Sequence, residues 1–170
     1  MALKVLQEKP LYLMAADTLR DYLDTVFSAD GPLVSYVNTS FQLVPDVVDD
    51  GISGTASSVP DNVLSVGLDH KSGYGGILWY CDLGLVDKVI EKNGADVANS
   101  VWVSLNPKPP VTDPKVLSDP WTPYFFDRVS VLPVSVIRAT IEDYFREGTG
   151  FRPTRVQWAK GHFTGELFHD

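Results

Sequence analysis

Residue types that commonly carry acid–base or metal chemistry are scarce in this chain. It contains three histidines, His70, His162 and His169, and one cysteine, Cys81. None of the histidines belongs to a His-Glu-x-x-His motif or to a His-x-Glu motif followed by Cys-x-x-Cys, which are the spacings that bind zinc. Cys81 follows the apolar residues 77–80, where a buried and inert thiol is expected. The sequence therefore predicts no metal and no cofactor.

A glycine-rich stretch and two pairs of carboxylates are the other candidates for chemistry. Gly73, Gly75 and Gly76 lie between two predicted strands. They lack the helix N-terminus with which glycine loops bind phosphate, so a hairpin turn is predicted instead. The pairs Asp49–Asp50 and Glu142–Asp143 fall in a predicted loop and on the polar face of a predicted helix. We expect solvated carboxylates at both places, and no catalytic residues are predicted.

Aromatic residues are more numerous than one small core needs. Trp79 and Tyr80 are neighbours on a predicted strand and must point to opposite faces, so one of them can lie on the face away from the helices. The tryptophans of predicted strands are interpreted as core residues. Trp121 and Tyr124 are flanked by prolines. Because tryptophan and tyrosine dominate the binding energy of many interfaces, these two residues are candidates to face a partner.

Negative charge is concentrated in one third of the sequence. The formal net charge is −8, and residues 21–70 hold eight acids and no lysine or arginine, whereas the rest of the chain holds fourteen acids and fourteen bases. An acidic surface repels phosphate backbones, so direct binding of nucleic acid is not expected. Two interpretations stay open: a surface complementary to a basic partner, or a feature that only keeps the protein soluble.

Neither a targeting segment nor a membrane span is predicted. Residues 1–19 include Lys4, Glu8 and Lys9 and lack the continuous apolar stretch of a signal peptide. The longest apolar runs are far shorter than a membrane-spanning helix. A single cysteine excludes an internal disulfide and fits a reducing compartment. We therefore expect a cytoplasmic protein without membrane association.

Hydrophobic periodicity predicts two amphipathic helices that would position these residues. The first spans residues 17–27 and has one apolar face, formed by Leu19, Tyr22, Leu23, Val26 and Phe27. The second begins at Pro133, where the missing N–H costs nothing, and ends at Gly148, which favours the left-handed conformation of helix ends. Its apolar face consists of Val134, Ile137, Ile141, Tyr144 and Phe145.

Most of the remaining chain is predicted to be extended. Strands are expected over residues 4–13 (interrupted at Pro10), 33–44, 62–69, 74–83, 100–105 and 154–158, and residues 124–132 are expected to be extended as well. The strands 62–69 and 74–83 form a predicted hairpin. Residues 85–98 have helical spacing but contain the helix-stopping pair Asn93-Gly94, and residues 45–60 are predicted to form a loop.

These elements predict an α+β fold. Because strands cluster without a helix between each pair, we expect a mainly antiparallel sheet of five to seven strands with two amphipathic helices packed on one face. A single domain over residues 1–170 is the default for this length. It would carry a proline-rich insert at residues 106–123, with six prolines and no regular structure, and a short C-terminal extension at residues 159–170.

The same elements carry a resemblance to a known family. A proline-started helix, Phe145, Gly150, the pair Arg152-Pro153 and a strand ending in Trp158 resemble the C-terminal half of the first numbered immunity-protein family of bacterial polymorphic toxin systems. The stretch YGGILWY at residues 74–80 is similar to the family's glycine-led strand ending in tyrosine. The resemblance covers roughly residues 62–158, and the proline-rich insert and the C-terminal extension depart from it. The motif residues, which include Pro133, are interpreted as structural.

The resemblance implies an immunity protein, not an enzyme, that binds and inhibits the C-terminal domain of a cognate secreted toxin. Members are encoded beside toxins that include nucleic-acid deaminases and nucleases, and we expect a deaminase first and a nuclease second. We expect the acidic loop to occlude a basic substrate cleft, with aromatic residues nearby. The predicted toxin-binding residues are Asp46, Asp49, Asp50, Tyr74, Trp121, Tyr124 and Asp127. Two alternatives stay open: a small cytoplasmic enzyme with His70 beside Asp69 or Asp82, and a generic protein-interaction module.

Overall fold

A central antiparallel sheet organises the computed structural model, which describes residues 2–6, 11–13, 15–28, 36–44, 62–81, 83–119 and 122–168. Seven strands follow the order β10-β6-β5-β4-β3-β1-β2, and β9 pairs with β5 beside them. All these pairs are antiparallel. The strands are β1 (Ala2–Leu6), β2 (Leu11–Leu13), β3 (Tyr36–Val44), β4 (Asn62–Asp69), β5 (Tyr74–Cys81), β6 (Val101–Leu105), β9 (Leu132–Pro133) and β10 (Gln157–Gly161). The predicted α+β fold is confirmed.

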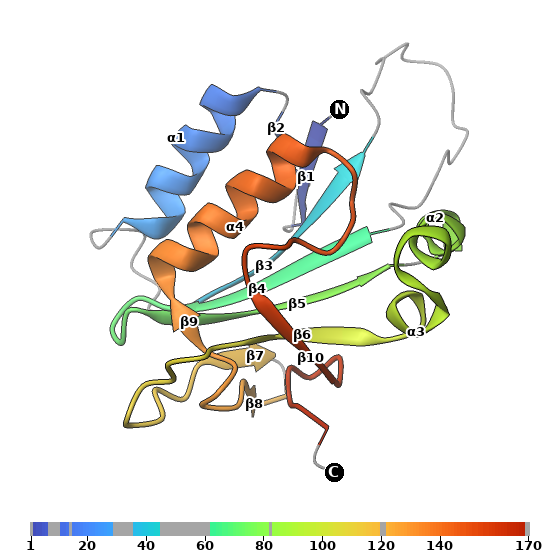
Figure 1. The fold of residues 1–170 in the computed structure, drawn as a ribbon. Helices are drawn as coiled ribbons and strands as arrows, with labels where there is room; N and C mark the ends of the chain where they lie inside the picture. Colours follow the sequence, from blue (N-terminus) through green and yellow to red (C-terminus); the bar gives the residue numbers. More distant parts are fainter. Residues whose placement is uncertain are drawn as a thin grey trace.

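Two helices cover one face of this sheet, as Figure 1 shows. They are α1 (Ala16–Phe27) and α4 (Val134–Glu147), and both match the predicted amphipathic helices closely. α1 turns Leu19, Leu23 and Val26 inward, and α4 turns Ile137, Ile141 and Tyr144 inward. Gly148 ends α4 in the left-handed conformation with φ 62°, as expected for a glycine after the last helical turn.

The ambiguous segment 85–98 forms two further helices. α2 (Leu83–Asn93) buries Leu85 and Val89 in the same core as α1 and α4. It stops at the predicted place, because Gly94 has φ 91° and begins the short helix α3 (Ala95–Ala98). Among the described elements, the helices that cover the sheet are therefore more numerous than the two predicted from periodicity.

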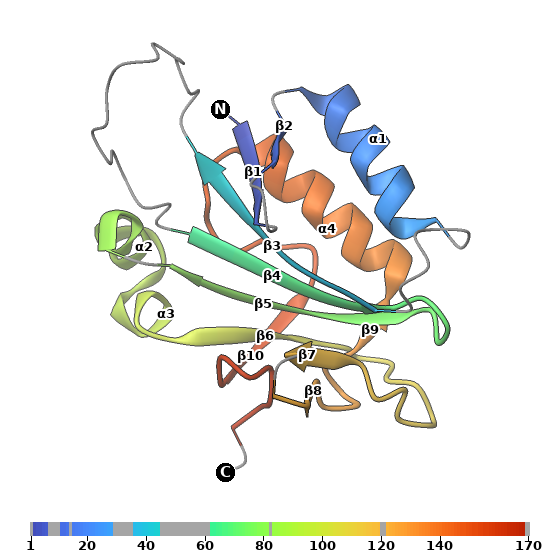
Figure 2. The same ribbon diagram turned by 180° about the vertical axis from the view of Figure 1, so that it is seen from behind.

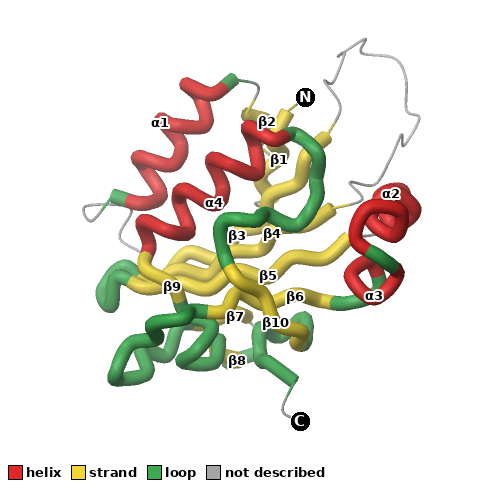
Figure 3. Tube along the Cα trace, viewed as in Figure 1, coloured by secondary structure: helices red, strands yellow, loops and turns green. Residues whose placement is uncertain are grey.

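The other face of the sheet is covered by inserted chain. The proline-rich segment contains β7 (Leu117–Asp119), which pairs with β8 (Tyr124–Phe125), and this small hairpin packs beneath the large sheet on the side away from the helices (Figures 2 and 3). A second apolar core lies between the two layers and consists of Leu78, Val103, Val116, Phe126 and Val131. The alternation along β5 follows this division, since Trp79 is fully buried in the first core and Tyr80 packs against the second.

The predictions for three segments were wrong. The proline-rich insert, expected to be irregular or polyproline-like, contains the strand β7. Residues 154–156 are not part of a strand, because the chain bends there and β10 begins only at Gln157. Trp158 donates its indole N–H to the Pro153 carbonyl at 2.7 Å, which holds this bend. Residues 124–132 are mostly not extended either, since Ser130 donates its N–H to the Asp127 carbonyl in a turn that separates β8 from β9.

β5 has two partner strands on the same side, and the hydroxyl group of one serine bridges the gap between them. β5 pairs with β9 through Tyr74 and Gly75 and with β6 through Leu78 and Trp79. Ser104 on β6 fills the gap between these partners: its Oγ accepts the Ile77 N–H at 3.1 Å and donates to the Ser130 carbonyl at 2.7 Å. A buried backbone group without a partner is costly, so this side chain allows the sheet to branch without losing hydrogen bonds.

The free edge of β10 is covered by the chain that follows it. Gly161 pairs with Val101 of β6 and forms an isolated bridge to Leu167. Phe168 donates its N–H to the Lys160 carbonyl at 3.1 Å, and His162 donates to the Glu166 carbonyl at 2.8 Å. Leu167 also packs against the second core. The described part of the C-terminal extension, residues 159–168, thus belongs to the fold.

Among the described helices, none is long and apolar enough to span a membrane.

Two paired glycines create the space into which the second layer fits. Gly67 on β4 lies opposite Gly76 on β5. A Cβ atom added at Gly76 would lie 2.4 Å from the Phe126 ring, and one added at Gly67 would lie 2.3 Å from the Leu117 carbonyl oxygen. The aromatic ring and the backbone of β7 therefore rest directly on the backbone of the sheet at this point.

Replacement of Gly76 by alanine should destabilise the protein by about 1–3 kcal/mol, because the added methyl overlaps the Phe126 ring and the second layer must shift. Chemical denaturation of Gly76→Ala, Phe126→Ala and the double variant measures this. We expect the two losses to be strongly non-additive, since removal of the ring relieves the overlap. Additive losses would show that the methyl group and the ring do not meet.

Candidate partner-binding surfaces

The described body of the protein is almost neutral. Its residues include fourteen acids and thirteen bases, a net charge of −1, so seven of the eight net negative charges belong to residues outside the described ranges. Asp46, Asp49 and Asp50 of the predicted binding surface are among the residues that lie outside these ranges. Of the eight acids in the stretch 21–70, Asp21, Asp24 and Asp69 belong to the described residues.

Charges on the helical layer are largely paired with one another. Arg138 of α4 contacts Asp24 of α1 at 2.6 Å and Glu142 of its own helix at 3.1 Å. The hydrogen bond to Asp24 is the main cause that raises the pKa of the Arg138 guanidinium. Arg20 pairs with Asp17 within α1. These contacts are exposed enough to contribute little stability each, but they offset part of the negative charge of the two helices.

Asp143 was expected to be solvated, and this was wrong. Its side chain is buried between Arg155, whose Nε donates to one carboxylate oxygen, and Arg146, whose Nη2 donates to the other. The hydrogen bond from Arg155 is the main cause that lowers the pKa of the Asp143 carboxyl. Helical periodicity alone places Asp143 on the polar face. The chain after α4 returns over this residue and buries it, which no local pattern reveals.

Substitution of Asp143 by asparagine should cost about 1 kcal/mol at neutral pH, because both arginine partners are partly exposed. The folded-state pKa of Asp143 lies below the ordinary value of 3.8, so its contribution to stability is complete above that value and is lost as the pH falls through the lowered pKa. Urea denaturation across a pH series should show the difference between wild type and Asp143→Asn shrinking on acidification. The exposed Asp21→Asn variant is the control, and a difference that persists at low pH would contradict the ion pair.

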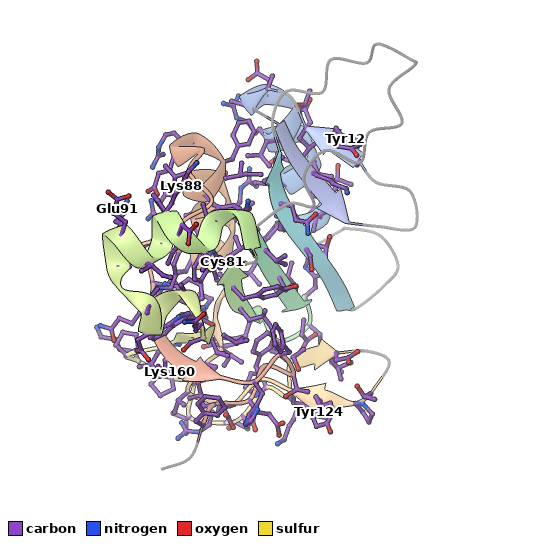
Figure 4. The ribbon with its side chains drawn as sticks, turned by 90° about the vertical axis from the view of Figure 1, so that its right-hand side faces the viewer. Tyr12, Cys81, Lys88, Glu91, Tyr124 and Lys160 are labelled. Atoms are coloured by element: carbon purple, nitrogen blue, oxygen red, sulfur yellow. The ribbon has the colours of Figure 1, made fainter. Side chains whose placement is uncertain are left out.

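Exposed aromatic side chains gather on the second layer. We call the set Tyr124, Phe125, Phe163 and Phe168 the outer aromatic residues; their exposed fractions are 41%, 37%, 67% and 49%. The insert and the C-terminal extension that carry them are joined, since Ser118 Oγ donates to the Thr164 carbonyl and Leu167 donates its N–H to Asp127 at 2.8 Å. Phe163 also makes an edge-to-face contact with Tyr80 of β5, with 4.9 Å between ring centroids. Figure 4 shows Tyr124 at the rim of this layer.

The structure places the described members of the predicted binding set at different depths. Tyr124 is on the surface, as expected for a residue that faces a partner. Tyr74 is half-buried and packs against the second core. The Asp127 carboxylate accepts the Leu167 N–H and so helps to hold the C-terminal extension. All three belong to the side of the sheet away from α1 and α4, and Trp121 lies outside the described residues.

The base of the acidic loop is fixed by a buried side-chain amide. Asn62, the first residue of β4, receives the Leu43 N–H at 3.0 Å and donates to the Leu43 carbonyl at 3.3 Å. Its Oδ1 also accepts the hydroxyl of Tyr144, which is buried on α4. Burial raises the pKa of the Tyr144 hydroxyl far above its usual value, so it remains a donor at all physiological pH. The end of β3 and the beginning of β4 are thereby joined to each other and to α4.

Loss of this amide should be more harmful than loss of the hydroxyl. Asn62→Ala removes the partners of two backbone groups and of Tyr144, and we expect a destabilisation of about 2–4 kcal/mol. Tyr144→Phe leaves the bonds to Leu43 intact and should cost about 1 kcal/mol. Thermal or chemical denaturation compares the two variants, with the exposed Asn99→Ala as control. Equal losses for both variants would show that the bonds to Leu43 contribute little.

The residues of the C-terminal motif hold the returning chain against the sheet. Pro133 directly precedes α4, and Phe145 packs half-buried against the first core. Gly150 has φ +74° and accepts the Trp79 indole N–H on its carbonyl at 3.1 Å. The Pro153 carbonyl accepts the indole N–H of Trp158, which is half-buried. The interpretation of these residues as structural agrees with their contacts. Arg152 is the exception, because its buried Nη1 has no hydrogen-bond partner.

Arg152 is a half-buried cation without an anion among the described residues. Its guanidinium lies over the Trp102 ring, 4.0 Å from the ring centroid. Its Nη1 is buried and has no hydrogen-bond partner, and burial lowers the pKa of the group. A cavity of about 490 Å³ opens beside it. From the sequence, Arg152 was predicted only to be a helix-stopping, structural residue, because residue spacing does not reveal its stacked position.

The residues considered for an enzyme do not assemble into a site in the described part of the chain. Nε2 of His70 is buried without a partner, and the Asp69 carboxylate accepts the Lys71 N–H at 3.0 Å in the hairpin turn. Asp82 lies outside the described residues. No group of three or more His, Cys, Asp or Glu residues able to hold a metal ion occurs in the described ranges. The Asp69 carboxylate therefore has a structural role in this turn.

Together these features define an α+β protein whose sheet has helices on one face and an inserted aromatic layer on the other. Comparison with family models identifies its class more closely: the model of the immunity protein Imm1 family matches residues 7–160, and the chain belongs to that family. It is thus an immunity protein directed against a toxin. No curated protein and no solved structure matched the chain. The family match begins at residue 7, far before the resemblance seen in the sequence, ends at nearly the same place, and includes the proline-rich insert.

Proposed function

We propose that this protein binds and inhibits the C-terminal domain of a cognate secreted toxin by occluding a basic substrate cleft. The preferred toxin is a nucleic-acid deaminase, and a nuclease is the second choice. Either enzyme must attract a polyanionic substrate, so its cleft carries positive charge. The inhibitor acts inside the cell that makes it, as a protein that binds neither nucleic acid nor membrane.

The observation that carries this proposal is the separation of charge in the chain. Residues 21–70 hold eight acids and no lysine or arginine, whereas the rest of the chain holds fourteen acids and fourteen bases. A feature that served only solubility would need no such concentration, because acids spread over the body would do as well. Concentrated negative charge is suited to enter a positively charged cleft and to accelerate encounter with it.

The attachment of the acidic segment supports the same proposal. Residues 45–61 begin just after Leu43 and Val44 of β3 and end at Asn62, which binds the Leu43 backbone and Tyr144. The residues that flank this segment are therefore tied to each other and to the buried Tyr144. We place the toxin contacts on Asp46, Asp49 and Asp50, with Tyr124 and its neighbours on the outer layer as aromatic anchors that slow dissociation.

Replacement of Asp46, Asp49 and Asp50 by asparagine should lower the association rate for the toxin domain encoded by the neighbouring upstream gene. We expect a decrease of about tenfold at low salt and a flatter dependence of the rate on ionic strength, with little change in stability. Surface plasmon resonance or stopped-flow measurements across a salt series give these rates.

A variant with the same change in net charge at other places is the matched control. Asp21→Asn, Asp87→Asn and Glu91→Gln together remove three exposed charges from α1 and α2. This variant should retain most of the association rate. If the two triple variants behave alike, net charge alone drives encounter and the acidic loop is not the contact. A neighbouring gene without a toxin domain would remove the basis of the proposal.

A further inference from the structure

The position of Arg152 is fixed by its neighbours and not by an ion pair. The segment that carries it leaves α4, crosses the helical side of the sheet and enters β10, as Figure 1 shows. The segment is held before Arg152 by the bond from Trp79 to the Gly150 carbonyl and after it by the bond from Trp158 to the Pro153 carbonyl. Trp102, which supports the guanidinium, is itself held by its indole N–H on the Val97 carbonyl at 3.0 Å.

Two neighbouring cations of the same region have carboxylate partners, whereas Arg152, like Lys92 over the Phe151 ring, has none among the described residues. Arg155 pairs with Asp143, and Lys160 pairs with Asp96. Within the described ranges, the guanidinium of Arg152 has only its contact with Trp102, and its buried Nη1 has no acceptor. Buried polar groups in proteins nearly always have a hydrogen-bond partner, so an exception requires an explanation. The rest of this half-buried side chain borders the adjoining cavity, which can admit an acceptor from outside the chain.

The lining of that cavity fits an acceptor with one negative charge. Besides Arg152, the residues that line it are uncharged: Asn93, Leu105, Pro153, Thr154, Val156, Gln157 and Trp158. A volume of about 490 Å³ suits an amino-acid side chain or the end of a peptide. Polar amides and a hydroxyl alternate there with apolar side chains, which suits a ligand that combines a charged end with an apolar part. A polyphosphate would meet a single cation on an acidic protein, which is a poor match.

We infer that the cavity beside Arg152 is a binding site for a carboxylate of a protein partner, which the guanidinium receives through paired N–H donors while Trp158 and Val156 contact the adjoining apolar atoms. The planar, forked guanidinium matches a carboxylate in this way. The carboxylate can be the C-terminus of a polypeptide or the side chain of Asp or Glu, because both present the same two oxygens. The site lies on the helical side of the sheet, opposite the outer aromatic residues.

The test uses the full chain and small peptides, and no toxin, so its outcome is independent of the proposed function. Isotope-labelled protein is titrated with acetyl-Ala-Ala-Ala as the free carboxylate, with the same peptide as the C-terminal amide, and with acetyl-Ala-Glu-Ala-amide. The indole N–H signals of Trp102 and Trp158 report on the site, and the signal of the fully buried Trp79 is the reference. We expect saturable shifts with one or both carboxylate peptides and none with the neutral amide. A response to only one of them identifies the source of the carboxylate.

Two variants establish the role of the guanidinium. Arg152→Gln should weaken binding of the carboxylate peptide at least about tenfold. The affinity of Arg152→Lys should lie between that of Arg152→Gln and that of the wild type, because lysine keeps the charge but lacks the forked pair of N–H donors. Gln157 is exposed, so the Gln157→Glu variant should fold normally. It should also block binding, since it places a competing carboxylate in the lining. Equal shifts with the neutral amide, unchanged binding in the folded variants, or no shift with either carboxylate peptide would overturn the inference. So would tighter binding of inorganic phosphate at the same signals.

Discussion

The amide of Asn62 is the interaction on which the arrangement of the described elements depends most. It joins the end of β3 to the beginning of β4 through both polar groups of Leu43, and it joins that end of the sheet to α4 through Tyr144. An added Cβ at Gly150 would lie 3.0 Å from the same amide, and the Gly150 carbonyl receives Trp79. A small set of buried polar groups thus fixes a helix, two strands and the returning chain to each other. Apolar burial holds these layers together, but it is not directional, and hydrogen bonds of this kind determine one register.

The sheet has two different faces because its central strands carry different residues on each. The side towards α1 and α4 presents large branched and aromatic side chains such as Leu64, Ile77 and Trp79. The opposite side has glycines at the centre, and Phe126 of the inserted layer lies against their backbone. A helix packs on a layer of side chains, whereas an irregular segment can approach a bare backbone more closely. The absence of side chains at Gly67 and Gly76 therefore explains why inserted chain, and not a further helix, covers this face.

Local sequence patterns predicted the helices and strands, but they did not predict the contacts between residues that lie far apart in the sequence. The hairpin of β4 and β5 and the amphipathic helices α1 and α4 follow from periodicity and from turn residues, and the sequence located them within a few residues. The burial of Asp143 depends on Arg155 from the segment after the helix, so periodicity placed it wrongly on a solvated face. Likewise, the opposite orientation of Trp79 and Tyr80 was predictable, but the layer that covers Tyr80 was not. Arg152 was recognised for its effect on the backbone, and only the fold revealed its unpaired charge.

The covered edge of β10 has a practical consequence for anyone who trims this protein. The family match ends at residue 160, yet the bridge from Gly161 to Leu167 and the contact of Phe163 with Tyr80 lie beyond that limit. A chain shortened to the family boundary would present the unpaired backbone of an edge strand together with part of an apolar core. Exposed strands of this type pair with each other between molecules, so such a fragment would be prone to self-association and precipitation. Expression trials that preserve the chain through Phe168 avoid that hazard.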